Sequence, residues 1–487
     1  MKPSTWIPAL AIPVIATTAV LTETWMYVPA AVAGVLFAAL AIARPRAAML
    51  LWLALAPIAT EYGTVPLPGG IPDITFSRAT IVLVGVALLL RARVQGRRML
   101  PLTPVEMAMG ALLFVVGADL LMRGSNVASE GLQRFDERIV PVLLFLVART
   151  LYTRAGDARR VIWILILVGA SLFAHGAYQW VRASGGARIT DAPESLAREE
   201  GGDRTNESHL EQGRAVGPFA NAVEYGAVVA VAFGAALVFA LHGAPVTRAV
   251  AAALLVPLGA AVVISMTRSV WIAAYLAVPL IGWIDRPRRA LVLSATAAVT
   301  VAGLAAFLFL PATSSFRERA VSVEPVSGRL LMYEIAGELA LERPLTGYGS
   351  GGPSRRAARR KLLVRGGAGA DLAPGQFHDT FLMTVVEWGL PGLLALVAIL
   401  ALFVRGGVAL RRQTGDGDDA RRFADVFLFA TVVYLMQCLL VDTPPFLYLN
   451  GVYFFLAGVV FAQLDARAVP AAERASHLAL GATAPAF

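Results

Sequence analysis

The sequence has few of the residues that form disulfides, bind metals or cover water-soluble surfaces. Cys438 is the only cysteine, so no disulfide can form within the chain. The five histidines are scattered, and no close set of His, Asp and Glu has metal-ligand spacing. No glycine-rich phosphate loop ending in Lys-Ser or Lys-Thr is present. Metal catalysis and ATP use therefore have no support, and we expect no metal site and no cofactor.

Charged side chains are also scarce, since they make up 15% of the 487 residues, whereas 57% are hydrophobic. This apolar share exceeds the roughly one-half that is usual in soluble domains. Apolar runs of about 20 residues, long enough to span a bilayer, recur along nearly the whole chain and leave no room for a large water-soluble domain. The composition predicts an all-α fold, a polytopic helical bundle in a lipid bilayer.

The apolar runs predict about 12 to 14 transmembrane helices. We expect the first run to be a retained span rather than a cleaved signal peptide, because no clean small-residue cleavage site follows it. The domain organisation is then transmembrane helices over 1–310, a large loop over 311–378, C-terminal transmembrane helices over 379–465 and a disordered tail over 466–487. The predicted spans are 6–22, 25–43, 47–60, 74–90, 104–122, 139–152, 161–181, 218–241, 248–265, 270–284, 290–310, 379–404, 423–441 and 446–464.

The formal charge of +9 comes from short basic clusters between the apolar runs. This is the positive-inside pattern of membrane proteins rather than a nucleic-acid-binding patch, so we expect no nucleic-acid partner. Alternating sides from a cytoplasmic N-terminus puts every cluster and both termini in the cytoplasm, and puts 182–217 and 311–378 outside. The clusters are Arg44/Arg46, Arg91/Arg93/Arg97/Arg98, Arg154/Arg159/Arg160, Arg286/Arg288/Arg289 and Arg405/Arg411/Arg412/Arg421/Arg422.

The large loop contains a stretch with helical spacing, GRLLMYEIAGELALERPL, over 328–345. It predicts an amphipathic helix on the outer face of the membrane or against the bundle. The basic run RRAARRK, 355–361, follows a flexible turn. We expect it either to contact anionic headgroups or to act as a mobile lid over a bound anion. The apolar side of the helix has Leu331, Met332, Ile335, Ala336, Leu339 and Ala340, and the acidic stripe has Glu334, Glu338 and Glu342.

Four basic side chains from distant segments fall on the outer side: Arg214, Arg268, Arg329 and His378. Each has an ordinary explanation, since arginines at span ends often reach the headgroups and histidines often mark helix boundaries. Their shared placement on the outer side favours a catalytic role. Arginines grip phosphate oxygens in pairs and stabilise a pyrophosphate leaving group, while a histidine removes a proton from an attacking hydroxyl. We therefore predict displacement of a lipid-linked pyrophosphate, with His378 as general base.

Carboxylates near these cations have two open interpretations each. Asp379 either orients His378 or caps the following helix. Glu387 lies nine positions after His378 on a similar helical face, where a carboxyl group is costly without a partner. It either holds an arginine or is a structural hydrogen-bonding group. Glu224 and Asp442 raise the same question.

Four blocks in order, RAVGPFANAVEYG, SMTRSVWIAAYLA, GRLLMYEIAGELALERPLTGYGSGG and FHDTFLMTVVEWGLPGLL, resemble the O-antigen ligase and O-antigen polymerase superfamily over roughly 210–400. The resemblance implies a GT-C-like, metal-independent glycosyltransferase of the bacterial inner membrane with a periplasmic active site. It implies an undecaprenyl-pyrophosphate-linked glycan as donor and a glycan or lipid-A-core acceptor. The family's essential arginines fall on Arg214 and Arg268, its loop histidine on His378, and the arginine opening its periplasmic helix on Arg329.

Two departures from the family pattern concern substrate binding. The family shows Asn-Pro-Asn where this chain has Asn221, Ala222 and Val223, and His-Asn where it has His378 and Asp379. We expect Arg329, Asn221, Glu387 and Asp379 to bind substrate, and the altered second block puts the acceptor site in doubt.

Ligase and polymerase activities need the same donor grip, so these residues do not separate them. The alternative from another class is a polysaccharide or lipid-linked glycan transporter or flippase, which needs charged residues along a path through the membrane rather than on one side. A structural scaffold would leave the shared side of the cations unexplained.

Overall fold

The computed structural model describes residues 28–62, 75–94, 102–123, 128–184, 214–219, 221–309, 317, 324–364 and 377–468. All regular structure within these residues is helical, which confirms the all-α prediction. Each predicted span from 25–43 onward coincides with a helix, whereas the run 6–22 lies outside the described residues. The last helix continues three residues into the predicted tail, and the rest of that tail lies outside the described residues.

Among the described residues, eight helices are long and apolar enough to cross a membrane, and three shorter apolar helices accompany them. The protein is therefore a polytopic membrane protein. The helices are α2 (Val28–Ala43), α3 (Pro45–Tyr62), α4 (Phe76–Val94), α5 (Pro104–Arg123), α6 (Ala128–Leu151), α7 (Asp157–Ser184), α10 (Ala222–His242), α11 (Pro245–Ile264), α12 (Arg268–Ile284), η5 (Arg286–Arg288), α13 (Arg289–Phe309), α15 (Glu324–Glu342), α16 (Gly352–Val364), α17 (Thr380–Gln413), α18 (Asp419–Leu440) and α19 (Leu447–Ala468).

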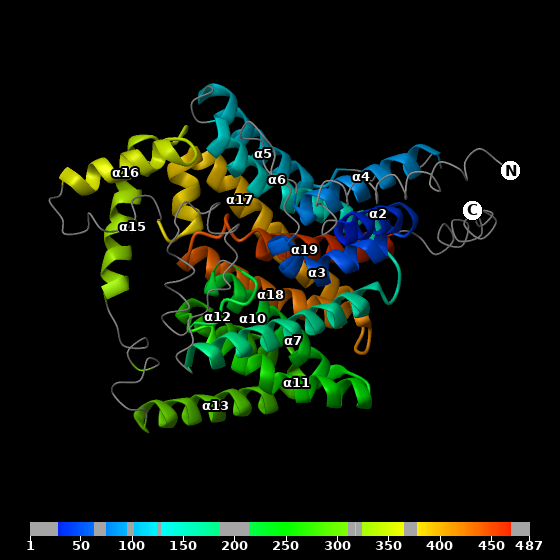
Figure 1. Ribbon diagram of the computed structural model, residues 1–487. Helices are drawn as coiled ribbons and strands as arrows, with labels where there is room; N and C mark the ends of the chain where they lie inside the picture. The colour runs from blue at the N-terminus through cyan, green and yellow to red at the C-terminus, as the bar shows by residue number, and fades with distance from the viewer. Residues whose placement is uncertain are drawn as a thin grey trace.

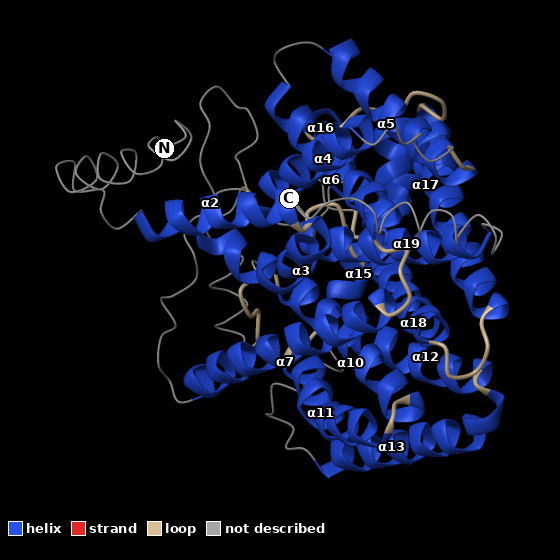
Figure 2. Ribbon diagram, turned by 90° about the vertical axis from the view of Figure 1, so that its right-hand side faces the viewer, coloured by secondary structure: helices blue, strands red, loops and turns tan. Residues whose placement is uncertain are grey.

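Helices α10, α18 and α19 form the centre of the bundle, while α13, α11 and α5 lie at its edges (Figures 1 and 2). The centre is rich in aromatic side chains. The rings of Tyr434 and Tyr453 stack at 4.0 Å, and Phe403 packs edge-on against Tyr453. Such contacts hold helices at fixed spacings, so the central helices are a rigid frame for whatever lies at their ends.

The long helices alternate in direction, which fixes the segments that share an end. The Ser269 hydroxyl at the start of α12 donates to Gln437 near the end of α18 (2.9 Å). The Thr380 hydroxyl at the start of α17 donates to the Val441 carbonyl (3.0 Å). Glu224 at the start of α10 accepts from the amide of Tyr448 at the start of α19 (3.0 Å). The starts of α10, α12, α17 and α19 therefore lie at one end, with the end of α18.

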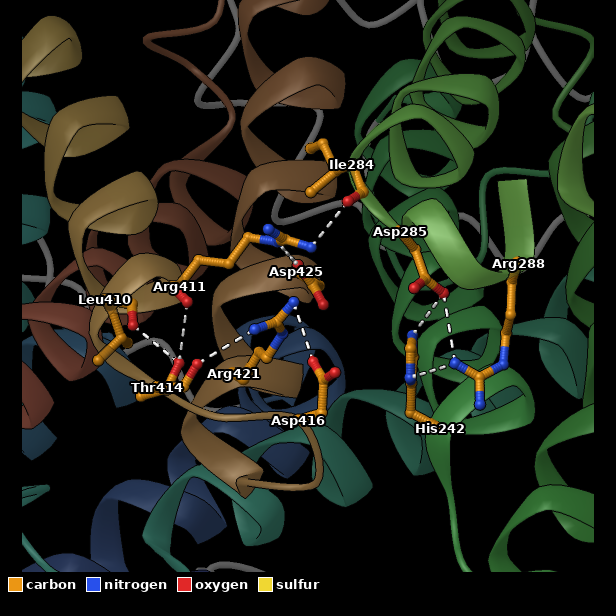
Figure 3. Close-up of polar contacts among 10 residues, drawn as sticks. All are labelled: His242, Ile284, Asp285, Arg288, Leu410, Arg411, Thr414, Asp416, Arg421 and Asp425. Carbon is orange, nitrogen blue, oxygen red and sulfur yellow. Dashed lines mark hydrogen bonds and ion pairs between the residues drawn. The ribbon is translucent and has the colours of Figure 1, made fainter. Parts of the chain in front are cut away.

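Polar side chains join the same helices at the opposite end (Figure 3). His242 contacts Asp285 at 3.1 Å, which ties the end of α10 to the end of α12. Arg411 of α17 pairs with Asp425 of α18 at 2.7 Å and donates to the Ile284 carbonyl at 3.0 Å. This end contains two of the basic clusters that the charge pattern assigns to the cytoplasm.

Helices α15 and α16 lie beside the start of α17 and extend beyond the bundle, at the left of Figure 1. A second, smaller apolar core joins them to α17. Met332, Ile335 and Leu339 of α15 are buried there, as the predicted amphipathic pattern requires. Of the two predicted positions, on the outer face of the membrane or against the bundle, the structure shows the second. The core residues are Met332, Ile335, Ala336, Leu339, Ala358, Leu362, Phe377, Met383 and Val386.

Candidate functional site

Arg214 lies in an extended segment that α7 and the turn between α11 and α12 hold in place. The Gln179 side chain of α7 accepts from the Gly217 amide (2.8 Å) and donates to the Gly217 carbonyl (2.9 Å). The guanidinium of Arg214 is buried and donates to the Thr267 hydroxyl at 3.0 Å. Since Thr267 directly precedes Arg268, the structure brings the first two predicted arginines to one turn.

Arg268 is the first residue of α12 and is partly exposed. The turn before it is tight, with Met266 at a φ of 50°. Its neighbour Ser269 anchors α12 to Gln437 of α18. The turn that contains Arg268 therefore lies beside the end of α18. Its contact there, Gln437, is five residues before Asp442.

His378 is held at the start of α17 by Asp442. The Asp442 carboxylate accepts from the backbone amides of His378 (3.3 Å) and Asp379 (3.1 Å). His378 has a φ of 53°, in the left-handed region that is uncommon for residues other than glycine. The hydrogen bonds that Asp442 accepts stabilise this conformation and so orient the side chain of His378.

Tyr333 of α15, one helical turn after Arg329, contacts the segment at the start of α17. The Tyr333 hydroxyl donates to the His378 carbonyl at 3.4 Å. Burial raises the pKa of Tyr333, Asp379 raises it further, Arg329 opposes this, and Asp442 adds a smaller increase. Tyr333 therefore connects α15 to the backbone of His378, and Arg329 lies one helical turn before Tyr333 on the same helix.

The imidazole of His378 is neutral at pH 7. Burial lowers its pKa to about 4, with a further contribution from the positive charge of Arg329. A neutral imidazole has a lone pair available to accept a proton or a hydrogen bond. Bound anions would raise this pKa by offsetting the charge of Arg329.

The other predicted substrate-binding residues make structural hydrogen bonds. Asn221 caps α10 by accepting from the Val223 amide (2.8 Å), and Asp379 caps α17 by accepting from the Leu382 amide (2.8 Å). Glu387 is buried and accepts from the Gly351 amide at 2.9 Å, at the start of α16. These contacts match the capping interpretation of Asp379 and the structural interpretation of Glu387, and their roles toward a substrate stay predictions.

Helix α17 is broken at Gly389, which has φ 65° and ψ −168°. The loop between α15 and α16 satisfies the backbone groups that the break exposes. The amides of Tyr348 and Gly349 donate to the carbonyls of Val386 and Glu387 (2.7 and 2.8 Å), and the Leu390 amide donates to the Pro344 carbonyl (2.7 Å). These hydrogen bonds hold the loop against α17, about three helical turns after His378.

Several residues that shape the site did not stand out in the sequence. Gln179, Thr267 and Tyr333 are single polar residues within apolar or mixed segments, and no spacing marks them. Asp442 was visible as a carboxylate at a span end, but its partners are 63 and 64 positions away. Within the described residues, no three His, Cys, Asp or Glu side chains are placed to hold a metal ion.

Residues 250–397 match the family described as O-antigen ligase. The match spans Arg268, Arg329 and His378, while Arg214 and Asp442 lie outside it and join the site through the contacts above. A search of the curated proteins gives no match.

Proposed function

We propose, because residues 250–397 match the O-antigen ligase family, that the cluster around His378 transfers a glycan en bloc from a lipid-linked pyrophosphate to a sugar acceptor. The donor we propose is an undecaprenyl-pyrophosphate-linked glycan, and the acceptor is a second glycan or a lipid-A core. The observation that supports this most is the joining of Arg214 to the Arg268 turn and of α15, through Tyr333, to His378, at the same end of α18.

In the proposed reaction, the acceptor hydroxyl oxygen bonds to the anomeric carbon of the donor glycan. The bond between that carbon and the pyrophosphate oxygen breaks, and the pyrophosphate leaves with the electron pair. His378 takes the hydroxyl proton. Arg214 and Arg268 stabilise the negative charge that grows on the pyrophosphate, a contribution typically worth 10²–10³ in rate for one such donor. Arg329 binds the donor and keeps His378 neutral until it does so.

The proposed membrane orientation places this cluster on the periplasmic side of the inner membrane and both termini in the cytoplasm. Its support is the positive-inside rule, because Arg288, Arg411 and Arg421 lie at the opposite end of the bundle (Figure 3). The long segment containing α15 and α16 then projects into the periplasm. The family match favours glycan transfer over the alternative of a transporter or flippase.

The test is transfer by the purified protein in proteoliposomes, supplied with a lipid-pyrophosphate glycan and candidate acceptors, with products analysed by mass. Arg214→Ala, Arg268→Ala and His378→Ala should each reduce transfer at least 100-fold, consistent with the loss of charge stabilisation or of a general base. Asp416→Ala is the matched control, because Asp416 is 83% exposed at the opposite end. Full transfer by any of the three variants would refute the role of that residue.

Cells lacking the protein would separate the two activities within the family. Loss of the ladder of repeat-unit lengths would identify a polymerase. Loss of lipid-A-core attachment, with the carrier-linked polymer retained, would identify a ligase.

A further inference from the structure

The basic run 355–361 forms most of α16, and its side chains divide between two faces. Ser354, Ala358 and Leu362 are spaced one helical turn apart and are buried against α15 and α17. Lys361 turns toward α15, where it pairs with Glu338 (2.8 Å) and Glu342 (2.6 Å). The inner side of α16 is therefore fully used by packing and by one ion-paired lysine.

The outer side of α16 has four exposed arginines: Arg355, Arg356, Arg359 and Arg360. They form two rows at a spacing of four residues, Arg355 with Arg359 and Arg356 with Arg360, so like charges lie one turn apart. Such like-charge pairs weaken a helix in water. An array of anions over this face would turn the repulsion into attraction, because each guanidinium can bind two phosphate oxygens.

Apolar side chains lie next to the arginines and indicate which anions fit. Leu363 and Val364, at the end of α16, are 63% and 86% exposed. On the partner helix α15, Leu341 is 82% exposed one residue before Glu342, and Leu345 in the following turn is 68% exposed. A glycan or a free pyrophosphate offers no apolar phase for these side chains, whereas a bilayer surface offers phosphates and acyl chains together.

We propose that the outer face of α16 binds anionic phospholipids at the membrane surface, with the four arginines on the headgroup phosphates and Leu363 and Val364 among the acyl chains. This contact positions α15 and α16 over the start of α17. Each basic residue at an anionic surface strengthens binding by about fivefold, so four give roughly a several-hundredfold preference for an anionic over a neutral bilayer. The proposal does not depend on glycan transfer.

A spin label on Leu363→Cys tests this proposal in the full chain. Cys438 is buried and is replaced by serine, so the label reports position 363 alone. In nanodiscs containing phosphatidylglycerol the label should be accessible to oxygen, and in phosphatidylcholine discs it should be accessible to a water-soluble nickel chelate. Changing the four arginines to glutamine should leave the label accessible to nickel in both.

The matched control removes four exposed arginines at the opposite end, by changing Arg159, Arg286, Arg405 and Arg412 to glutamine. It should leave the label immersed in phosphatidylglycerol discs. A label on otherwise unchanged protein that stays accessible to nickel in those discs would overturn the proposal, whatever the folding of the variants.

A second measurement separates a lipid from a soluble anion. Phenylglyoxal modification of the α16 arginines, read by peptide mass, should be slowed by phosphatidylglycerol in the disc and not by inorganic pyrophosphate added to neutral discs. Protection by pyrophosphate without protection by phosphatidylglycerol would assign this face to the donor and overturn the lipid assignment.

Discussion

Substitution of Gly389 by alanine adds one methyl group and should separate the loop at 344–351 from α17. Its φ of 65° and ψ of −168° belong to a region that only glycine adopts readily. A Cβ atom built there would lie 2.6 Å from the carbonyl carbon and oxygen of Leu345 and 2.7 Å from the Pro344 oxygen. These are backbone atoms, so the contact cannot be relieved by a side-chain rotation.

The expected loss for Gly389→Ala combines two contributions. Holding alanine in this conformation costs about 1–3 kcal/mol. Moving the chain to relieve the contact breaks the hydrogen bond from Leu390 to Pro344, worth about 1 kcal/mol, and disturbs those from Tyr348 and Gly349. The sum is roughly 2–4 kcal/mol. Because His378 begins the same half-helix, glycan transfer should fall together with stability.

The assay is thermal unfolding in detergent, with transfer measured at a temperature where the variant stays folded. Gly337→Ala is the control, because Gly337 is within α15 and an added Cβ meets nothing within 4 Å. That change should be neutral or stabilise the protein by up to about 1 kcal/mol. Equal stability and transfer for Gly389→Ala and Gly337→Ala would refute the reasoning.

Four further predictions concern the residues that hold the site. Asp442→Ala removes the acceptor for two backbone amides, so it should destabilise the start of α17 by about 2 kcal/mol and strongly reduce glycan transfer. The control Asp416→Ala should do neither. Equal transfer by the two variants would contradict this prediction. As pH is lowered, kcat/KM should stay constant until His378 is protonated near pH 4. Because the charge of Arg329 lowers the pKa of His378, Arg329→Gln should move the decrease in kcat/KM to higher pH. An unchanged pH profile would argue against an electrostatic interaction between the two side chains. The pKa of His378 is about 4 in the folded protein and 6.5 in the unfolded chain, so protonation should destabilise the fold as pH falls from 6.5 through 4. His378→Gln should weaken this pH dependence of the free energy of unfolding. An unchanged pH dependence would contradict the burial of the imidazole. Gln179→Leu keeps the volume but leaves the Gly217 amide without its acceptor, so the segment containing Arg214 should loosen in hydrogen exchange and the KM for donor should rise; unchanged protection there would count against it.

The helices were readable from the sequence because a bilayer leaves helices as the simple way to satisfy the backbone of a long apolar run. The pattern around Met332, Ile335 and Leu339 also predicted which side of α15 is buried. The sequence predicts a flexible turn before the run at 355–361, and the structure shows that the run itself is part of a helix, because the packing of Ala358 and Leu362 on α15 stabilises it. A role as a lid stays a prediction.

The interactions that organise the site depend on tertiary contacts, so they could not be predicted from the sequence. A carboxylate or amide at the start of a membrane helix can bind a substrate or cap a backbone, and Asn221, Asp379 and Glu387 show the second use once their partners are visible. Pro391 follows the break in α17 by two residues and cannot donate a backbone hydrogen bond. The structure adds that the loop after α15 supplies the missing hydrogen bonds, and no local pattern indicates such a pairing.

The most direct test of a single shared site is a double-variant cycle on glycan transfer with Arg214→Ala, His378→Ala and the two combined. Groups that act in one transition state are strongly non-additive. The account predicts that the double variant transfers about as slowly as the slower single variant. Independent effects that multiply, or full transfer by either single variant, would contradict it.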